Sequence, residues 1–431
     1  MRSTVARFRR RSAPALAALL LCFSSGALAQ QTVVKAARML DVVTGKIVQP
    51  AVVITSGDRI AAINPATIPD AATVIDLGDA TLLPGLIDSH VHLMDDPGTS
   101  WIRQRAYETP ALWALRAAGN AERSLLAGFT TIRDVGSTGF VDVAVSKATD
   151  AGWIRGPRVV PVGHYITTTG GHCDLTGFAP GVLERGPESG VADGPDEIRK
   201  AIRYQTKHGA KWIKMCATAG IFSFDRTVGA QQYSEAELRA GVEEAALHGI
   251  RVAAHAHGTE GILAAVRAGV RSIEHGSILT EEAIQLMKSR GTWLVPQAYI
   301  GQAIDPSTLE PAIRAKHDYI NPIARRSLEK AIRAGVKIAF STDGPLPNSD
   351  PGREFAALVD RGMTPLQSIQ AATIRGAEML ELEDRGHLAP GKLADLIAVG
   401  GNPLQNIRMM ENVIFVMKGG SVFKPVRRPA N

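Results

Sequence analysis

The middle of the chain repeats a unit in which an amphipathic helical pattern ends at a glycine and a short apolar run follows at once. The glycines of the six repeats are Gly128, Gly209, Gly249, Gly269, Gly291 and Gly335. A glycine suits the position after a helix because the backbone there often adopts a positive φ. Apolar strands that alternate with helices predict a parallel sheet. Further apolar runs at 81–92 and 158–168 bring the predicted strands to eight.

Several predicted helices begin at residues that commonly cap a helix. These signals are Ser234 with Glu237, Asn321 with Pro322, and Thr364 with Pro365. Eight strand–helix units predict an α/β protein with a closed (β/α)8 barrel, which we place at residues 85–386. An open doubly wound sheet is the alternative. It is disfavoured because no G-x-G-x-x-G motif follows an early strand.

The two ends of the chain have a different pattern. Residues 32–80 and the segment from 387 onward consist of short β-branched runs that are broken by Gly, Asp and Pro. Two β-rich ends therefore enclose one long α/β segment.

Composition is that of an ordinary globular protein. Of the 431 residues, 45% are hydrophobic and 21% are charged, which disfavours disordered and collagen-like structure. The formal net charge of +6 and the pI of 9.3 would suit nucleic acid or an anionic membrane as a partner. The position of the positive charges removes this suggestion.

Five arginines lie at the N-terminus, before an apolar run at 13–21 and the A-x-A motif Ala27-Leu28-Ala29. This order predicts a signal peptide at residues 1–29 and hence a secreted or periplasmic protein; a buried N-terminal helix is the alternative. Without these 29 residues the chain has 402 residues and a net charge of +1. We therefore expect no nucleic-acid partner and no membrane span in the mature chain.

Three cysteines are too few for a disulfide framework, and Cys22 lies in the predicted signal peptide. Cys173 and Cys216 could pair in an oxidising compartment. We favour two separate free thiols over a disulfide.

Polar residues stand where the predicted strands end. They are His90 and His92 in the first strand, Lys214 in the fourth, His255 and His257 in the fifth, His275 in the sixth and Asp343 in the eighth. The chemistry of a βα barrel lies at the carboxyl ends of its strands. A single histidine would most often be structural, but five of the 11 histidines gather at these ends.

Their spacing suits metal binding. Residues i and i+2 of a strand point to the same face, so His90 and His92 can bind one ion. Neutral imidazole suits zinc and similar ions. His255 and His275 come from neighbouring strands and could reach a second ion. Asp343 could serve as an anionic ligand or as a general base.

Lys214 differs from the other candidates, because an ammonium group cannot bind a metal and is costly to bury. Addition of CO2 to the neutral amine would give a carbamate, an anion whose two oxygens can bridge two cations. Lys211 is the competing candidate, but it falls near the start of the strand. A surface position for Lys214 is disfavoured by its apolar neighbours Trp212, Ile213 and Met215.

Together, the motif PGLIDSHVH at 84–92, the lysine of the fourth strand, His255, His275 and the motif STDGP at 341–345 resemble the amidohydrolase superfamily. Within it, the sequence is similar to the imidazolonepropionase-like metal-dependent hydrolases. That branch includes Xaa-Pro and Xaa-Arg dipeptidases and ochratoxin-hydrolysing amidohydrolases. The resemblance implies a distorted (β/α)8 barrel with a small β-sandwich formed by residues 30–84 and 387–431.

The resemblance also implies two divalent ions, which we expect to be Zn²⁺. The implied ligands are His90, His92 and Asp343 for the first ion, His255 and His275 for the second, and carboxylated Lys214 as a bridge. His257 would contact the substrate or support a ligand rather than bind metal. Two divalent ions activate water and polarise a carbonyl. Asp343 would take the proton from the water and pass it to the leaving amine.

Two segments are expected to contact the substrate. The loop GHYITTTGGHCD at 163–174 holds His164, Tyr165 and His172, and a plain surface loop is its alternative interpretation. The segment 217–227 holds Arg226, a candidate partner for a substrate carboxylate.

The branch and the signal peptide together predict a secreted hydrolase that cleaves an amide next to a carboxylate, as in dipeptides, N-acyl amino acids or ochratoxin A. Alternatives are a cyclic-amide hydrolase of the imidazolone type, a lactonase or organophosphate esterase, and a non-catalytic amidohydrolase-like structural protein. The last is disfavoured because no ligand position is missing. The branch also implies a homo-oligomer.

Overall fold

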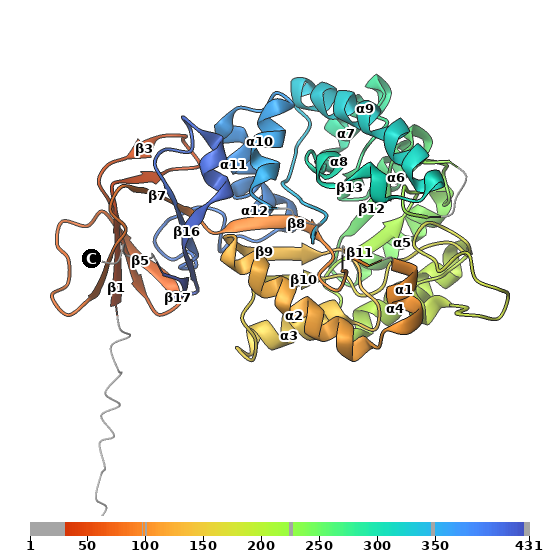
Figure 1. Cartoon of the computed structure of the whole chain (residues 1–431), viewed down its shortest axis with the longest axis horizontal. Coiled ribbons are helices and arrows are strands. Elements are labelled where there is room, and N and C mark those ends of the chain that lie inside the picture. Colours follow the sequence, from red (N-terminus) through yellow and green to blue (C-terminus); the bar gives the residue numbers. More distant parts are fainter. Residues whose placement is uncertain (1–30, 97, 100, 224–226, 346–349, 426–431) are drawn as a thin grey trace, which may run out of the picture.

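The computed structural model describes residues 31–425, apart from residues 97, 100, 224–226 and 346–349. The predicted signal peptide and Arg226 therefore lie outside the described residues. Figure 1 shows a body in which helices surround a set of strands, and beside it a smaller lobe of strands from both ends of the chain.

Parallel strands form the centre of the body. They make two sheets, with the orders β10–β9–β8 and β11–β12–β13–β14. Their bounds are β8 Leu86–Val91, β9 Phe129–Asp134, β10 Arg158–Pro161, β11 Ile213–Cys216, β12 Val252–Ala256, β13 Ser272–His275 and β14 Trp293–Val295. Almost all of their residues are buried, as expected for parallel strands that helices cover.

Backbone hydrogen bonds join the two sheets beyond the end of β10. The amide of Ile166 donates to the carbonyl of Lys214 on β11, and the amide of Cys216 donates to the carbonyl of Ile166, both at 2.8 Å. The predicted strand at 158–168 therefore consists of the short β10, a bend, and this bridge.

The segment 338–344 joins the sheets on the other side. Ile338 forms a parallel bridge with Leu294 of β14, and the amide of Asp343 donates to the carbonyl of His90 on β8 at 2.9 Å. This segment takes the place of the predicted eighth strand, although it contains no regular strand. The strands consequently follow one another around a ring in chain order.

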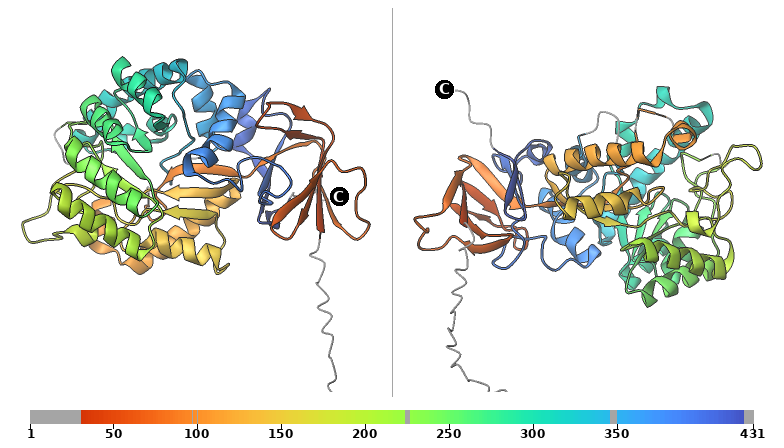
Figure 2. Two further views of the ribbon diagram at one scale, coloured as in Figure 1. Left: turned by 180° about the vertical axis from the view of Figure 1, so that it is seen from behind. Right: turned by 90° about the horizontal axis from the view of Figure 1, so that it is seen from below.

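Figures 1 and 2 both show helices on the outside of this ring of strands. The longer ones are α2 Pro110–Leu126, α3 Val141–Asp150, α4 Gly194–His208, α5 Glu235–Leu247, α6 Thr259–Ala268, α7 Glu281–Arg290, α9 Pro311–Ala334 and α10 Arg353–Asp360. The shorter ones are α1 Trp101–Tyr107, α8 Ile300–Ala303, α11 Pro365–Ala371 and α12 Ile374–Leu380. Short 3-10 turns cover Pro187–Ser189, Pro306–Thr308 and Ile407–Glu411.

Most of the predicted helix ends are present. Ser234 forms a capping box with Glu237 at the start of α5, and Thr364 caps α11 with Pro365 in the first turn. The glycines that follow α4, α6, α7 and α9 have positive φ, and they are Gly209, Gly269, Gly291 and Gly335.

The predicted helix start at Asn321-Pro322 is wrong. Helix α9 begins at Pro311 and continues through Pro322 to Ala334. Proline has no N–H to donate to the residue four positions earlier, so the helix loses one hydrogen bond at this point. A helix of 24 residues that buries one face can tolerate this loss, and a local Asn-Pro signal cannot show that the helix has already begun.

The lobe is built by both ends of the chain. Strand β15 (Leu396–Gly400) pairs antiparallel with β7 (Ala80–Pro84) in a sheet of the order β17–β16–β15–β7–β2–β3, and a second sheet has the order β5–β4–β1–β6. The remaining bounds are β1 Gln31–Ala36, β2 Arg38–Leu40, β3 Ile47–Val48, β4 Ala51–Ser56, β5 Arg59–Ile63, β6 Thr73–Asp76, β16 Val413–Lys418 and β17 Ser421–Lys424. Apolar side chains from both sheets, such as Val34, Val53 and Leu82, pack in one core.

Within the described ranges, no helix has both the length and the apolar character that crossing a bilayer requires.

Candidate metal centre

Two groups of side chains that could each hold a metal ion lie at the carboxyl ends of the strands. One consists of His90, His275 and Asp343, and the other of His255, His257 and His275. The ligand atoms in each group lie within 4.8 Å of one another. Because His275 belongs to both groups, they form one continuous cluster.

The first group extends to His92. Its Nε2 atom lies 3.3 Å from Nε2 of His90, and both nitrogens approach Oδ1 of Asp343, at 3.4 Å and 3.1 Å respectively. His90 lies in β8 and His92 directly follows its last residue, Val91, which accounts for the first pairing because residues two apart along a strand share a face. The backbone bond from Asp343 to His90 explains the second. Three atoms that can each offer a lone pair therefore converge on one point.

His92 and His275 each contact a hydrogen-bond acceptor through Nδ1, the ring nitrogen on the other side from Nε2. Nδ1 of His92 lies 3.2 Å from the carbonyl oxygen of Gly136, and Nδ1 of His275 lies 2.7 Å from Oε1 of Gln297. A carbonyl oxygen can only accept, so Nδ1 carries the proton in each ring. Nε2 then keeps its lone pair, which is the form in which a histidine binds a metal.

The second group contains a buried atom that lacks a partner. Nε2 of His255 has no hydrogen bond among the described residues, whereas Nδ1 of His257 lies 2.7 Å from the hydroxyl of Ser277. An unsatisfied buried polar atom costs free energy, and a nearby cation would offset part of that cost. Convergent imidazoles and one carboxylate match the ligands that zinc and similar divalent ions prefer. The residues present therefore fit a metal centre.

Burial keeps the imidazole rings of His92 and His257 uncharged. It lowers the pKa of His92 and that of His257 to about 4, so both rings are neutral near pH 7. Burial also lowers the pKa of Lys214 to about 8, against the opposing effect of the negative charges of Glu274 and Asp343. The Lys214 amine is therefore partly neutral in mildly alkaline solution, which is the form that can react with CO2.

The backbone at two candidate ligands is unusual. His275 and Asp343 have φ values of 71° and 58°, which non-glycine residues rarely adopt. Such residues cost about 1–3 kcal/mol each and gather at functional sites. Asp88 helps to hold the second one, because its carboxylate accepts bonds from the amide and the hydroxyl of Thr342, at 3.2 Å and 2.6 Å.

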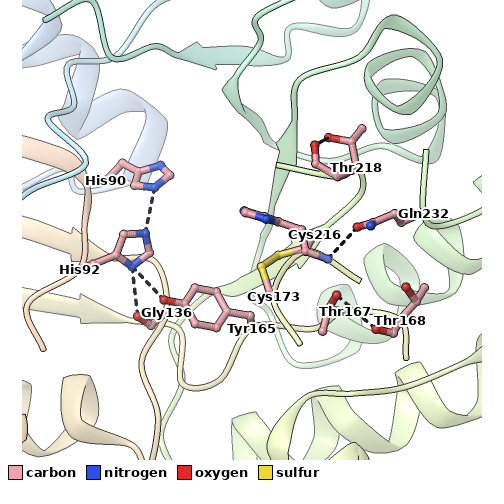
Figure 3. The surroundings of a disulfide bond; sticks show 12 residues. His90, His92, Gly136, Tyr165, Thr167, Thr168, Cys173, Cys216, Thr218 and Gln232 are labelled. Atoms are coloured by element: carbon pink, nitrogen blue, oxygen red, sulfur yellow. Dashed lines mark hydrogen bonds between the residues drawn. A yellow bond between two sulfur atoms is a disulfide. The ribbon is translucent and has the colours of Figure 1, made fainter. Parts of the chain in front are cut away.

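The loop after β10 reaches this cluster (Figure 3). The Tyr165 hydroxyl lies 3.2 Å from Nδ1 of His92. The His172 ring stacks on that of His255, with 4.1 Å between the centroids. The structure thus brings two of the three residues predicted in this loop to the candidate ligands.

The third, His164, has both ring nitrogens engaged inside the protein. The amide of Gly139 donates to its Nε2 at 3.0 Å, and its Nδ1 lies 3.1 Å from Oε1 of Gln205. A substrate contact of His164 stays a prediction, and so does that of Arg226, which lies outside the described residues.

The expectation of two free thiols is wrong, because Cys173 and Cys216 form a disulfide. Cys216 ends β11, and Cys173 lies in the loop after β10, with 6.4 Å between the Cα atoms (Figure 3). Backbone hydrogen bonds join Ile166 to β11, and the disulfide adds a second, covalent link between this loop and β11. A separation of 43 residues along the chain gave no sign of this proximity.

Two buried charges close to the site were missed by the sequence analysis. Glu274 on β13 contacts Nδ1 of His90 at 2.6 Å and Nη2 of Arg133 on β9 at 2.9 Å. All three side chains are fully buried. Although burial alone would raise the pKa of Glu274, Arg133 and the bond to His90 hold it below its usual range. The available signal was a charged residue inside each of two apolar strands.

Comparisons with known proteins show which family the chain resembles. Residues 81–423 match the model of the Amidohydrolase family. The chain is 35% identical to ochratoxinase from Aspergillus niger over 367 residues, which cover 80% of this chain and 75% of the relative. It is 28% identical to imidazolonepropionase from Cutibacterium acnes over 375 residues, which cover 82% and 84%.

The fold is similar to that of solved relatives. The crystal structure of a Xaa-Pro dipeptidase with bound methionine in the active site superposes with a TM-score of 0.87 and 35% identity. The match covers 92% of this chain and all of that one. The chain is thus a hydrolase that acts on amide or peptide bonds. On this evidence, it belongs to the amidohydrolase family.

Proposed function

We propose that the chain is a secreted hydrolase with two divalent metal ions that cleaves amide bonds next to a carboxylate, in dipeptides, N-acyl amino acids or ochratoxin A. The observation that carries this proposal is the single cluster in which His275 links the two groups of candidate ligands.

His90, His92 and Asp343 would hold one ion, and His255 and His275 the other. Zinc is the ion that we expect, because imidazole and carboxylate ligands suit it. When bound, the ions supply Lewis acidity and an activated water. A carboxylated Lys214 would add an anion between the two ligand groups. In support, Lys214 lies almost fully buried on β11 and its pKa is lowered to about 8 by burial.

Asp343 is the candidate acid–base group. Its carboxylate lies at the junction of the ligand cluster, within 3.4 Å of both His90 and His92, where it can take a proton and return it to the leaving amine. His172, Tyr165 and His257 would face the substrate, and the first two are held in the loop that the disulfide ties down.

The substrate class rests on the relatives. Ochratoxinase and the Xaa-Pro dipeptidase are similar to this chain over most of its length, at 35% identity each. A cyclic amide is the second candidate, because the chain also matches imidazolonepropionase. The higher identity to the first two favours a linear amide.

We further propose that the ring of strands is a closed (β/α)8 barrel at residues 85–386, and that residues 30–84 and 387–431 form a β-sandwich. The bridges at Ile166 and Ile338 and the shared sheet of β7 and β15 support these assignments. The Cys173–Cys216 disulfide supports export to an oxidising compartment. A homo-oligomer stays a prediction that the mass of the purified protein in solution would test.

The function is tested by assaying zinc-loaded protein against a library of dipeptides and N-acyl amino acids, with ochratoxin A and a cyclic imidazolone included. We expect hydrolysis of linear amides with a free carboxylate and a large loss of kcat/KM when that carboxylate is converted to an amide. Preferential hydrolysis of the cyclic amide, or no hydrolysis by protein that carries metal, would contradict the proposal. Metal uptake with and without bicarbonate tests the carboxylation of Lys214, which predicts faster uptake with bicarbonate.

A further inference from the structure

A fully buried network lies directly behind one candidate ligand. Oε2 of Glu274 contacts Nδ1 of His90 at 2.6 Å. The other oxygen, Oε1, accepts from Nη2 of Arg133 at 2.9 Å and from the hydroxyl of Ser272 at 2.5 Å. Both carboxylate oxygens are therefore engaged, and the carboxylate is fixed on two sides.

Arg133 is itself fixed by several partners. Its Nε donates to the carbonyl of Ser89 at 2.6 Å, and its Nη1 donates to the hydroxyl of Ser272 at 3.3 Å. Its guanidinium lies over the ring of Trp212, 4.8 Å from the centroid. The network thus connects β8 and β9 in one sheet with β13 in the other, and it ends on His90.

The partner of His90 differs from those of the other candidate ligands. His92 contacts a backbone carbonyl, His275 a side-chain amide and His257 a hydroxyl. Only His90, among the candidate histidines whose contacts the structure describes, meets a carboxylate through its second nitrogen. A carboxylate there fixes the ring orientation, selects the tautomer with a free Nε2 and makes that nitrogen a stronger donor to a metal.

We infer that Glu274, held by Arg133, is a positioning residue that orients His90 and strengthens its bond to the first metal ion. A purely structural ion pair would need neither the contact with His90 nor a position behind the ligand atoms. The inference rests on the proposed metal centre, and its test must separate the two ideas.

The test uses Glu274→Gln, which removes the negative charge and nearly preserves the shape. Cobalt replaces zinc because its visible absorption reports the ligands around it. We measure the affinity of each cobalt ion by competition with a chelator, together with the absorption spectrum. We expect one of the two ions to bind about 10–100-fold more weakly, with a changed spectrum, and the other ion to keep its affinity.

A matched control is available in helix α5, where Glu244 is also buried. Glu244 on α5 also accepts from an arginine and a histidine, Arg203 at 2.7 Å and His248 at 3.2 Å. Glu244→Gln should leave both cobalt affinities and the spectrum unchanged. A loss of affinity in Glu244→Gln that equals the loss in Glu274→Gln would overturn the inference.

Glu274→Gln leaves Arg133 buried without its counter-charge, and this variant could fail to fold. The double variant Arg133→Met/Glu274→Gln removes both charges and should show the same weakening at one ion. If either folded variant binds both ions as tightly as the wild type with the same spectrum, Glu274 does not position His90. If the wild type binds no cobalt, the metal centre itself is refuted, and the inference about Glu274 falls with it.

Discussion

Cys173 and Cys216 are joined by a disulfide that ties the loop after β10 to the end of β11. The residue before Cys173, His172, stacks on the candidate ligand His255. Lys214, the candidate bridge, lies two residues before Cys216. The covalent link therefore acts at the point where the predicted substrate loop meets the predicted metal centre.

Removal of this link should loosen the loop. For Cys173→Ala/Cys216→Ala we expect the free energy of unfolding to fall by about 2–4 kcal/mol, since the bridge closes a loop of 43 residues. KM should rise while the metal content stays the same. Urea unfolding, steady-state kinetics and elemental analysis measure these effects, with reductant-treated wild type as the control. An unfolding midpoint that does not respond to the substitutions or to reductant would refute this role.

Asp343→Asn should separate metal binding from proton transfer. Asparagine tolerates the left-handed backbone at φ 58° and keeps an oxygen near His90 and His92, but it cannot take up a proton. We expect kcat to fall by about 10²–10⁴-fold with much of the metal retained. Exposed Asp318→Asn is the control and should behave like the wild type. Normal turnover in Asp343→Asn would exclude the acid–base role.

The number of metal ions bound per chain decides whether His257 is a metal ligand or a substrate contact. Its ring stacks on that of His275 with 4.8 Å between the centroids, so the geometry also permits a ligand role. We expect His257→Asn to keep both ions and to raise KM, because His257 is predicted to face the substrate. His255→Asn serves as the comparison and should lose one ion. Loss of one ion in His257→Asn would instead make it a ligand.

The pH dependence of stability tests the burial of His172. Burial, with the positive charges around the ring, lowers its pKa to about 3, against an ordinary value of 6.5. The unfolded chain therefore binds a proton first as the pH falls, and the folded state loses stability below pH 6.5 by about 1.4 kcal/mol per pH unit. Buried Asp88, whose pKa is raised to about 7 by burial, acts in the opposite direction over the same range.

The measurement is therefore a difference between two proteins. In metal-free samples, His172→Gln should gain about 2 kcal/mol relative to the wild type between pH 7 and pH 5. Urea unfolding at both values gives the comparison, in which the contribution of Asp88 cancels. A difference that is the same at pH 7 and pH 5 would show that His172 is not held neutral by burial.

The sequence predicted which side chains come together better than it predicted the regularity of the fold. The candidate ligands His90, His255 and His275 converge because strand ends meet at one edge, a rule that needs only the strand pattern. Asp343 converges too, although its segment forms isolated bridges instead of a regular strand. The hydrophobic pattern of a segment indicates that it is buried. It does not show whether the segment forms the regular backbone hydrogen bonds that define a strand.

Long-range partners could not be predicted. The Cys173–Cys216 bridge and the contact between Glu274 and His90 depend on which segments become neighbours in three dimensions. Arg133 and Glu274 did carry a signal, because a charge inside an apolar strand must find a partner when it is buried. Opposite charges in two such strands could have been paired by this reasoning.

The most direct test of the account is the number of zinc ions per chain in purified enzyme, measured by elemental analysis alongside its rate of amide hydrolysis. Two ions per chain are predicted, with the rate lost when a chelator removes them and recovered when zinc returns. Full hydrolytic activity in protein that carries fewer than about one ion per chain would contradict a two-metal centre built by His90, His92, His255, His275 and Asp343.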